Sequence, residues 1–83
     1  MDKYDYLILD IIQEHKDSNN ELIRLTSIEQ RFWKKIEDDV TLSVGQAKIG
    51  ERITNLYLRG HIQNRGGYSL TKRGREELQC QYV

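Results

Sequence analysis

The sequence predicts a small α+β protein in which helices pack around a short β-hairpin. Apolar residues recur at three- and four-residue spacing in several segments, which is typical of amphipathic helices. Two short runs with period-two alternation flank Arg65-Gly66-Gly67, which predicts a hairpin. The chain has 83 residues, 37% hydrophobic and 31% charged, so we expect one globular domain over residues 1–83. A core this small often needs self-association, which favours a homodimer.

The first helix is expected over residues 3–16 and should serve the core. The carboxylate of Asp2 or Asp5 suits the positive N-terminal end of this helix, and residues 17–21 predict a polar loop after it. Its apolar positions recur at helical spacing: Tyr4, Leu7, Ile8, Ile11 and Ile12.

A short strand and a second helix follow. Residues 22–25 form a short, mainly apolar run that is too brief for a helix, so they predict a strand. Thr26 with Glu29 is a capping-box pattern and predicts a helix over residues 27–37. Trp33 is interpreted as a packing residue rather than a base-stacking platform. The stripe beside it consists of Ile28, Phe32 and Ile36.

The third helix is expected over residues 43–59 as one continuous element. Ser43 and Gln46 form a second capping box, and Gly60 suits the left-handed position that ends a helix. The acidic residues 37–39 make the preceding connection longer than a usual helix-turn-helix turn and would repel phosphate. The predicted buried stripe consists of Leu42, Ile49, Ile53 and Leu56.

The hairpin is expected over residues 61–71, with its turn at Arg65-Gly66 and with Tyr68 and Leu70 at period two. Thr71 then caps a last helix over residues 72–80. This helix is expected to pack Leu78, with Cys80 as a further candidate, against the core. Residues 81–83 are expected to form a frayed tail.

These motifs resemble a known family. The chain carries the series Ile53-x-x-Leu56-x-x-x-Gly60-x-Ile62, then a glycine turn, then Tyr68-x-Leu70-Thr71-x-x-Gly74-x-x-x-Leu78. The series is similar to the second half of winged helix-turn-helix transcription regulators of the MarR, PadR and archaeal-repressor kind. The resemblance implies a winged helix: a three-helix core with a short strand, a β-hairpin wing and a C-terminal helix. It also implies sequence-specific binding of double-stranded DNA, with recognition helix 43–59 in the major groove and wing 61–71 on the adjacent groove or backbone.

The charge distribution agrees with this expectation better than the net charge does. The formal net charge is zero. Residues 1–47 hold six basic and ten acidic groups, whereas residues 48–75 hold seven basic groups and one acidic group, Glu51. A neutral protein with segregated charge can present a basic face to phosphate, although a chance imbalance on a solvated surface would look the same.

Candidate base contacts lie on the third helix. With about 100° of rotation per residue, Lys48 and Asn55 project away from the buried stripe, and Gln46 and Arg52 lie at its margins. Gln46 suits an adenine edge, and Lys48 and Arg52 suit guanine or phosphate. Ala47 or Val44 suits a thymine methyl group. The resemblance assigns Arg65 to the minor groove, and Lys72 and Arg73 suit phosphates. The predicted DNA-binding set is Ser43, Gln46, Ala47, Lys48, Arg52, Asn55, Arg65, Lys72 and Arg73.

Two glycines within the third helix need a reason. Gly45 and Gly50 each cost helix stability, by roughly 1 kcal/mol relative to alanine. We expect something to approach them closely, either the second helix or DNA, and internal packing alone remains the alternative.

The sequence is also compatible with functions other than DNA binding. Leu58 projects away from the stripe and Tyr57 lies near its edge, and together they predict a contact surface, most simply a homodimer seam. The alternative to DNA binding is therefore a winged-helix protein–protein interaction module, and a weaker alternative is binding of structured RNA through the same basic face. Fold alone does not decide among them.

The residue inventory argues against an enzyme. Two histidines and one cysteine, Cys80, offer no zinc-ligand spacing, and His61 is expected to be a semi-exposed structural residue. No phosphate-loop motif, cofactor motif or small-molecule site is evident. No apolar run approaches 18 residues and no secretory signal opens the chain, so we expect a cytoplasmic protein without a membrane span.

Overall fold

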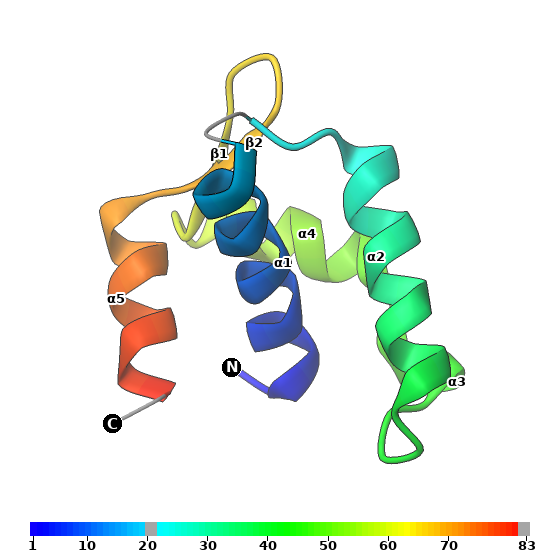
Figure 1. Ribbon diagram of the computed structural model, residues 1–83. Helices are drawn as coiled ribbons and strands as arrows, with labels where there is room; N and C mark the ends of the chain where they lie inside the picture. The colour runs from blue at the N-terminus through cyan, green and yellow to red at the C-terminus, as the bar shows by residue number, and fades with distance from the viewer. Residues whose placement is uncertain (20–21, 82–83) are drawn as a thin grey trace.

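Helices surround a two-stranded hairpin in the computed structural model, which describes residues 1–19 and 22–81 (Figure 1). The predicted α+β class is confirmed. The elements are α1 (Lys3–Asn19), α2 (Leu25–Asp38), α3 (Val44–Ala47), α4 (Ile49–Leu58), β1 (Ile62–Asn64), β2 (Tyr68–Leu70) and α5 (Lys72–Gln81).

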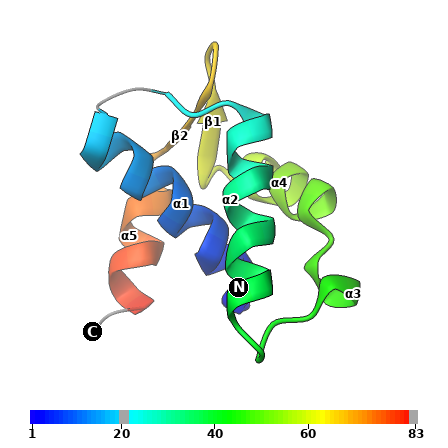
Figure 2. The same cartoon turned by 45° about the vertical axis from the view of Figure 1, so that its right-hand side comes forward.

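Helix α1 is the central element of the core and contacts α2, α4, α5 and β2 (Figures 1 and 2). Its side chains Ile8, Leu9 and Ile11 are completely buried because neighbours cover several of its sides. The stripe predicted on α2 is confirmed, since Ile28, Phe32 and Ile36 are all buried. Trp33 is 36% exposed and lies edge-on to Phe32, with ring centroids 5.6 Å apart.

The start of α1 agrees with the prediction. The Asp2 carboxylate accepts hydrogen bonds from the backbone amides of Tyr4 and Asp5, each 3.1 Å long. The helix runs to Asn19, three residues beyond its predicted end, so part of the predicted polar loop is helical. The rest of that loop, residues 20–21, lies outside the described residues.

The strand predicted over residues 22–25 is reduced to one antiparallel bridge between Ile23 and Tyr68. These residues exchange backbone hydrogen bonds of 3.1 and 2.7 Å. Helix α2 begins at Leu25, so the predicted capping box at Thr26 is wrong: the cap position is Arg24, which makes no side-chain capping bond to the described part of the helix. Thr26 is already inside the first turn, where a capping geometry is not available.

A glycine allows the chain to pair at this bridge. A β-carbon on Gly67 would lie 2.6 Å from the Leu22 Cβ, so a side chain there would displace the segment that carries Ile23.

The end of α4 and the hairpin follow the predicted pattern. Gly60 has φ 81°, and the amides of His61 and Gly60 donate to the carbonyls of Leu56 and Tyr57 at 2.9 and 3.1 Å. This pair of bonds is a Schellman ending, which satisfies the last carbonyls of the helix. Strands β1 and β2 pair antiparallel, with Ile62 opposite Leu70.

Thr71 caps α5 as predicted, because its hydroxyl accepts a 3.1 Å hydrogen bond from the Gly74 amide. Leu78 packs into the core, whereas Cys80 is exposed. The predicted tail begins too early, because Gln81 still belongs to α5. Residues 82–83 lie outside the described part of the chain.

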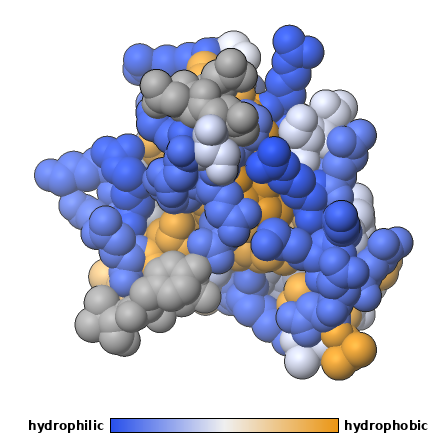
Figure 3. Space-filling model, in the orientation of Figure 1, coloured by the Kyte–Doolittle hydropathy of each residue, from blue (hydrophilic) through white to orange (hydrophobic). Residues whose placement is uncertain are grey.

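The face that carries α1, α2 and α5 is mainly hydrophilic (Figure 3). Apolar atoms show between the helices and over the region of α3, where Val40 and Val44 are 99% and 66% exposed. No helix within residues 1–19 and 22–81 has the length and apolar character needed to cross a bilayer.

Candidate nucleic-acid interface

The helix predicted over residues 43–59 is broken at Lys48. This residue has φ 43° and ψ 49°, a left-handed conformation that ends α3 and starts α4. Figure 2 shows the short α3 set apart from the axis of α4. The prediction of one continuous helix is therefore wrong. We call residues 44–50, which contain α3, Lys48 and the first residues of α4, the elbow.

The break changes which side chains face solvent. Ala47 is completely buried, so the prediction that it contacts a thymine methyl group is wrong. The projection at 100° per residue assumed an unbroken helix. The left-handed backbone of Lys48 turns α3 relative to α4, so the side chains of α3 do not point in the predicted directions. Ser43, Gln46, Lys48 and Asn55 are exposed. Ile53 and Leu56 are buried, and Leu42 and Ile49 are partly buried against the core, so the predicted stripe is confirmed.

Arg52 turns inward, toward the start of α1. Its side chain is 17% exposed and pairs with the carboxylates of Asp2 and Asp5 at 2.7 and 3.3 Å. Partial burial alone would lower the pKa of Arg52, but the hydrogen bonds to the two carboxylates outweigh it and raise that pKa. The prediction that Arg52 contacts DNA is therefore not supported, because its guanidinium is already occupied within the protein.

Two adjoining hollows form an open surface between α4 and the hairpin. Gly50, Glu51, Thr54 and Asn55 line the first hollow. The second hollow shares Thr54 and reaches the strands, where it is lined by Ile53, Thr54, Tyr57, Asn64 and Tyr68. We call this surface the α4–hairpin face. Asn64 and Tyr68 were not predicted as site residues, because only the folded hairpin brings them beside α4.

Exposed cations lie around the α4–hairpin face. Lys48 is two residues before Gly50, and Arg65 follows Asn64 in the hairpin loop, which extends beyond the helices (Figure 1). Lys72 and Arg73 open α5, which is joined to the C-terminal end of α4 by a hydrogen bond from the Thr71 hydroxyl to the Gly60 carbonyl. All four cations are exposed. Glu51, which lines the first hollow, places a negative charge on this face.

The two glycines of the elbow have open space above them. A β-carbon at Gly45 would meet only the Ser43 Oγ, at 3.8 Å, and one at Gly50 would meet no other described atom within 4 Å. The expectation that the second helix approaches them is therefore wrong. The described part of the chain supplies no packing reason for either glycine.

His61 lies behind the face, where α4 gives way to β1. It is 4% exposed rather than semi-exposed as predicted, and its Nδ1 has no hydrogen-bond partner among the described residues. Burial lowers its pKa, and the positive charges of Arg73 and Arg59 lower it further. Arg59 was not singled out from the sequence; it is a further exposed cation, at the C-cap of α4 and two residues before His61.

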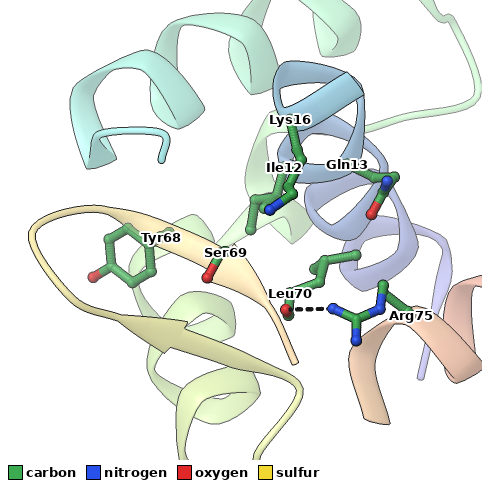
Figure 4. A pocket seen from close by; sticks show the side chains of 7 residues that line it. All are labelled: Ile12, Gln13, Lys16, Tyr68, Ser69, Leu70 and Arg75. Atoms are coloured by element: carbon green, nitrogen blue, oxygen red, sulfur yellow. Dashed lines mark hydrogen bonds between the residues drawn. The ribbon is translucent and has the colours of Figure 1, made fainter. Parts of the chain in front are cut away.

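A separate small pocket lies between α1, β2 and α5 (Figure 4). Arg75 closes one side of it by donating a 3.2 Å hydrogen bond to the Leu70 carbonyl. Its volume of about 50 Å³ is far below the roughly 300–1,000 Å³ of typical small-molecule sites. No group of three histidine, cysteine or acidic side chains in the described ranges is placed to hold a metal ion.

Comparison with family models, curated proteins and solved structures gave no match. The case for a function therefore rests on the sequence motifs and on the geometry of the elbow and the α4–hairpin face.

Proposed function

We propose that this protein is a winged-helix regulator that binds double-stranded DNA with its elbow and α4–hairpin face. In this proposal α4 is the recognition helix and the β1–β2 hairpin is the wing. The observation that carries the proposal is the left-handed backbone of Lys48, in an elbow whose two glycines are open to solvent.

A left-handed lysine is strained, and a glycine would adopt the same backbone without that cost. Strained residues cluster at functional sites, where the surrounding structure holds them in place. Lys48 is the only non-glycine residue with positive φ in the described part of the chain, and its side chain is exposed at the elbow. The strained backbone of Lys48 is explained if it places the side-chain ammonium group against a phosphate or a guanine edge.

The two glycines of the elbow also favour close approach of DNA. Gly45 and Gly50 lower helix stability without relieving any internal contact. A surface without side chains at these positions lets a phosphodiester backbone or a base edge approach the elbow directly. Ser43, Gln46 and Asn55 are exposed nearby and supply the hydrogen-bonding groups that read base edges.

The surrounding cations suit phosphate contacts. Three exposed cations do not line the two hollows but follow on from the face along the chain: Arg65 in the hairpin loop, and Lys72 and Arg73 at the start of α5. Such an arrangement fits a duplex whose phosphates flank the groove that α4 enters. Lysine and arginine in the first turn of α5 oppose its dipole, and phosphate contacts would compensate for that placement.

The proposal is tested by measuring duplex affinity for single alanine variants. We expect Lys48→Ala and Arg65→Ala each to weaken binding to a random duplex by about five- to tenfold at low salt, because each removes one phosphate contact. Lys34→Ala, which removes an exposed cation from α2, is the matched control and should change affinity less than twofold. Equal effects of all three variants would contradict the proposed interface.

A second candidate function is protein–protein interaction, including the homodimer seam expected from the sequence. Leu58 is 73% exposed and Tyr57 is 53% exposed, both on α4. Sedimentation of the wild type and of Leu58→Asp tests whether α4 forms a dimer seam. A dimer lost in Leu58→Asp supports the seam, whereas a wild-type monomer at high micromolar concentration rules it out.

A further inference from the structure

The guanidinium of Arg52 joins the elbow to the first turn of α1. Its Nε and Nη2 donate to the carbonyls of Ala47 and Gln46 at 2.5 and 2.8 Å. Its Nη1 donates to both carboxylate oxygens of Asp2, at 2.7 and 2.8 Å. One side chain therefore connects the last residues of α3 with the N-terminal residues of the protein.

These contacts meet a specific need of the elbow. A helix leaves its last carbonyls without partners, and α3 stops at Ala47 because Lys48 is left-handed. Arg52 supplies hydrogen bonds to the carbonyls of Gln46 and Ala47, which are the two residues immediately before the break. The guanidinium group of Arg52 thus holds the chain in place immediately before the strained Lys48.

The neighbours of Asp2 in the first turn of α1 hold the same segment. The Tyr4 hydroxyl accepts a 2.8 Å hydrogen bond from the Ser43 amide, and its ring lies 4.7 Å from the Arg52 guanidinium. The Lys3 ammonium donates to the Thr41 carbonyl at 2.7 Å. Residues 2–5 thus contact Thr41 and Ser43 before the elbow and Arg52 after it.

We propose that the first turn of α1 is a positioning clamp, with Arg52 at its centre, that sets the orientation of the elbow for duplex binding. This inference rests on the proposed function. Arg52 and Asp2 are positioning residues: Arg52 touches the backbone of the elbow, and Asp2 holds Arg52. Bonds between charged partners are strong enough for this role where, as here, the arginine is largely covered.

The clamp predicts an effect of Asp2→Asn whose sign separates it from the alternatives. Asparagine still caps α1, because its side-chain oxygen accepts the same amide bonds, but it loses the closer of the two charges that hold Arg52. The clamp predicts that duplex affinity falls by about five- to tenfold although a negative charge has been removed. If Arg52 were a phosphate contact held back by Asp2, the same change would raise affinity and steepen its salt dependence.

The salt dependence of binding provides the second readout. We expect Asp2→Asn and Arg52→Lys to keep the wild-type slope of log affinity against log salt, because no phosphate contact is lost. Lys48→Ala should reduce that slope by about one contact. Glu37→Gln, which removes an exposed carboxylate from α2, is the charge-matched control and should raise affinity slightly. A rise in affinity in Asp2→Asn equal to that of Glu37→Gln would overturn the clamp.

Hydrogen exchange of backbone amides separates failure of the clamp from failure of the proposed function. Without any nucleic acid, Asp2→Asn should accelerate exchange of amides in residues 43–49 at least tenfold, while those of the α2 interior stay unchanged. If the wild type binds no duplex but this acceleration is seen, the clamp stands and the proposed function fails. Unchanged exchange at the elbow would overturn the clamp whatever the duplex affinity.

Discussion

Lys48 combines a backbone that glycine prefers with a side chain that glycine lacks. At the residue scale, its two properties can be separated by substitution. Lys48→Gly removes both the charge and the left-handed strain, whereas Lys48→Ala removes the charge and keeps the β-carbon that causes the strain.

We expect Lys48→Gly to be more stable than Lys48→Ala by about 1 kcal/mol in the free energy of unfolding, measured with urea. Both variants should lose the same duplex affinity, because both lack the ammonium group. Equal stability of the two variants would show that residue 48 is not left-handed in solution.

His61 is the second residue with a testable consequence. Its pKa is lowered from 6.5, first by burial and then by the charges of Arg73 and Arg59. The unfolded chain therefore binds more protons than the folded chain as the pH falls below 6.5, so stability rises with pH in this range. The stabilisation is complete above the unfolded pKa and is lost as the pH falls toward the lower folded pKa.

We expect the unfolding free energy to decrease as the pH falls from 7 toward 5, and His61→Leu to flatten this dependence. The measurement is urea unfolding across that pH range, with His15→Gln as the control for the other histidine. Asp2 and Asp39 have pKa values lowered from 3.8, so their contribution is lost only at more acidic pH. A profile unchanged by His61→Leu would contradict the burial of a neutral His61.

At the element scale, two glycines in helices have opposite surroundings. A β-carbon on Gly74 in α5 would lie 2.0 Å from the His61 carbonyl oxygen, whereas one on Gly50 in α4 would meet no described neighbour within 4 Å. The first glycine therefore allows α5 to pack against the start of β1. The second has no such purpose within the described protein.

We expect Gly50→Ala to stabilise the protein by up to about 1 kcal/mol and to weaken duplex binding, because a methyl group then occupies the approach to the elbow. Gly74→Ala, despite the same gain in helix propensity, should destabilise by about 2 kcal/mol or more because its β-carbon collides with backbone. Thermal unfolding and duplex titration measure the two effects. Unchanged duplex affinity in a stabilised Gly50→Ala would count against close approach of DNA.

The elements also show what local pattern can predict. The stripe on α2, the Gly60 ending of α4 and the Thr71 cap of α5 follow from residues within a few positions of one another, and all three were predicted. The break at Lys48 was not predicted, because neither the pattern at Ser43 and Gln46 nor the apolar spacing signals a left-handed residue inside the helix. Ala47 is buried beside that break, and Arg52 pairs with an aspartate 50 positions away in the sequence, which local pattern does not reveal. Both residues therefore leave the predicted site.

At the scale of the whole molecule, charge is neutral in sum and segregated along the chain. Arg52 is neutralised by Asp2 and Asp5, so the positive charge that this region offers to a partner comes from the exposed cations Lys48, Arg65, Lys72 and Arg73. Glu51 lines the first hollow of the α4–hairpin face, and its negative charge opposes the attraction of the cations for phosphate.

We expect Glu51→Gln to raise affinity for random duplex by about three- to tenfold, because it removes the negative charge closest to the docked phosphates. A control change, Glu76→Gln on α5, should have a smaller effect. A decrease in random-duplex affinity for Glu51→Gln would mean that this carboxylate does not face nucleic acid.

The central claim is that the cations around the elbow and hairpin contact the phosphates of a duplex. The most direct measurement is the affinity of the wild-type protein for a random duplex at salt concentrations from about 50 to 300 mM. Four contacts, from Lys48, Arg65, Lys72 and Arg73, predict a slope of log affinity against log salt of roughly −3 to −4 per protomer. Binding that is independent of salt, or undetectable at the lowest salt concentration, would contradict the claim.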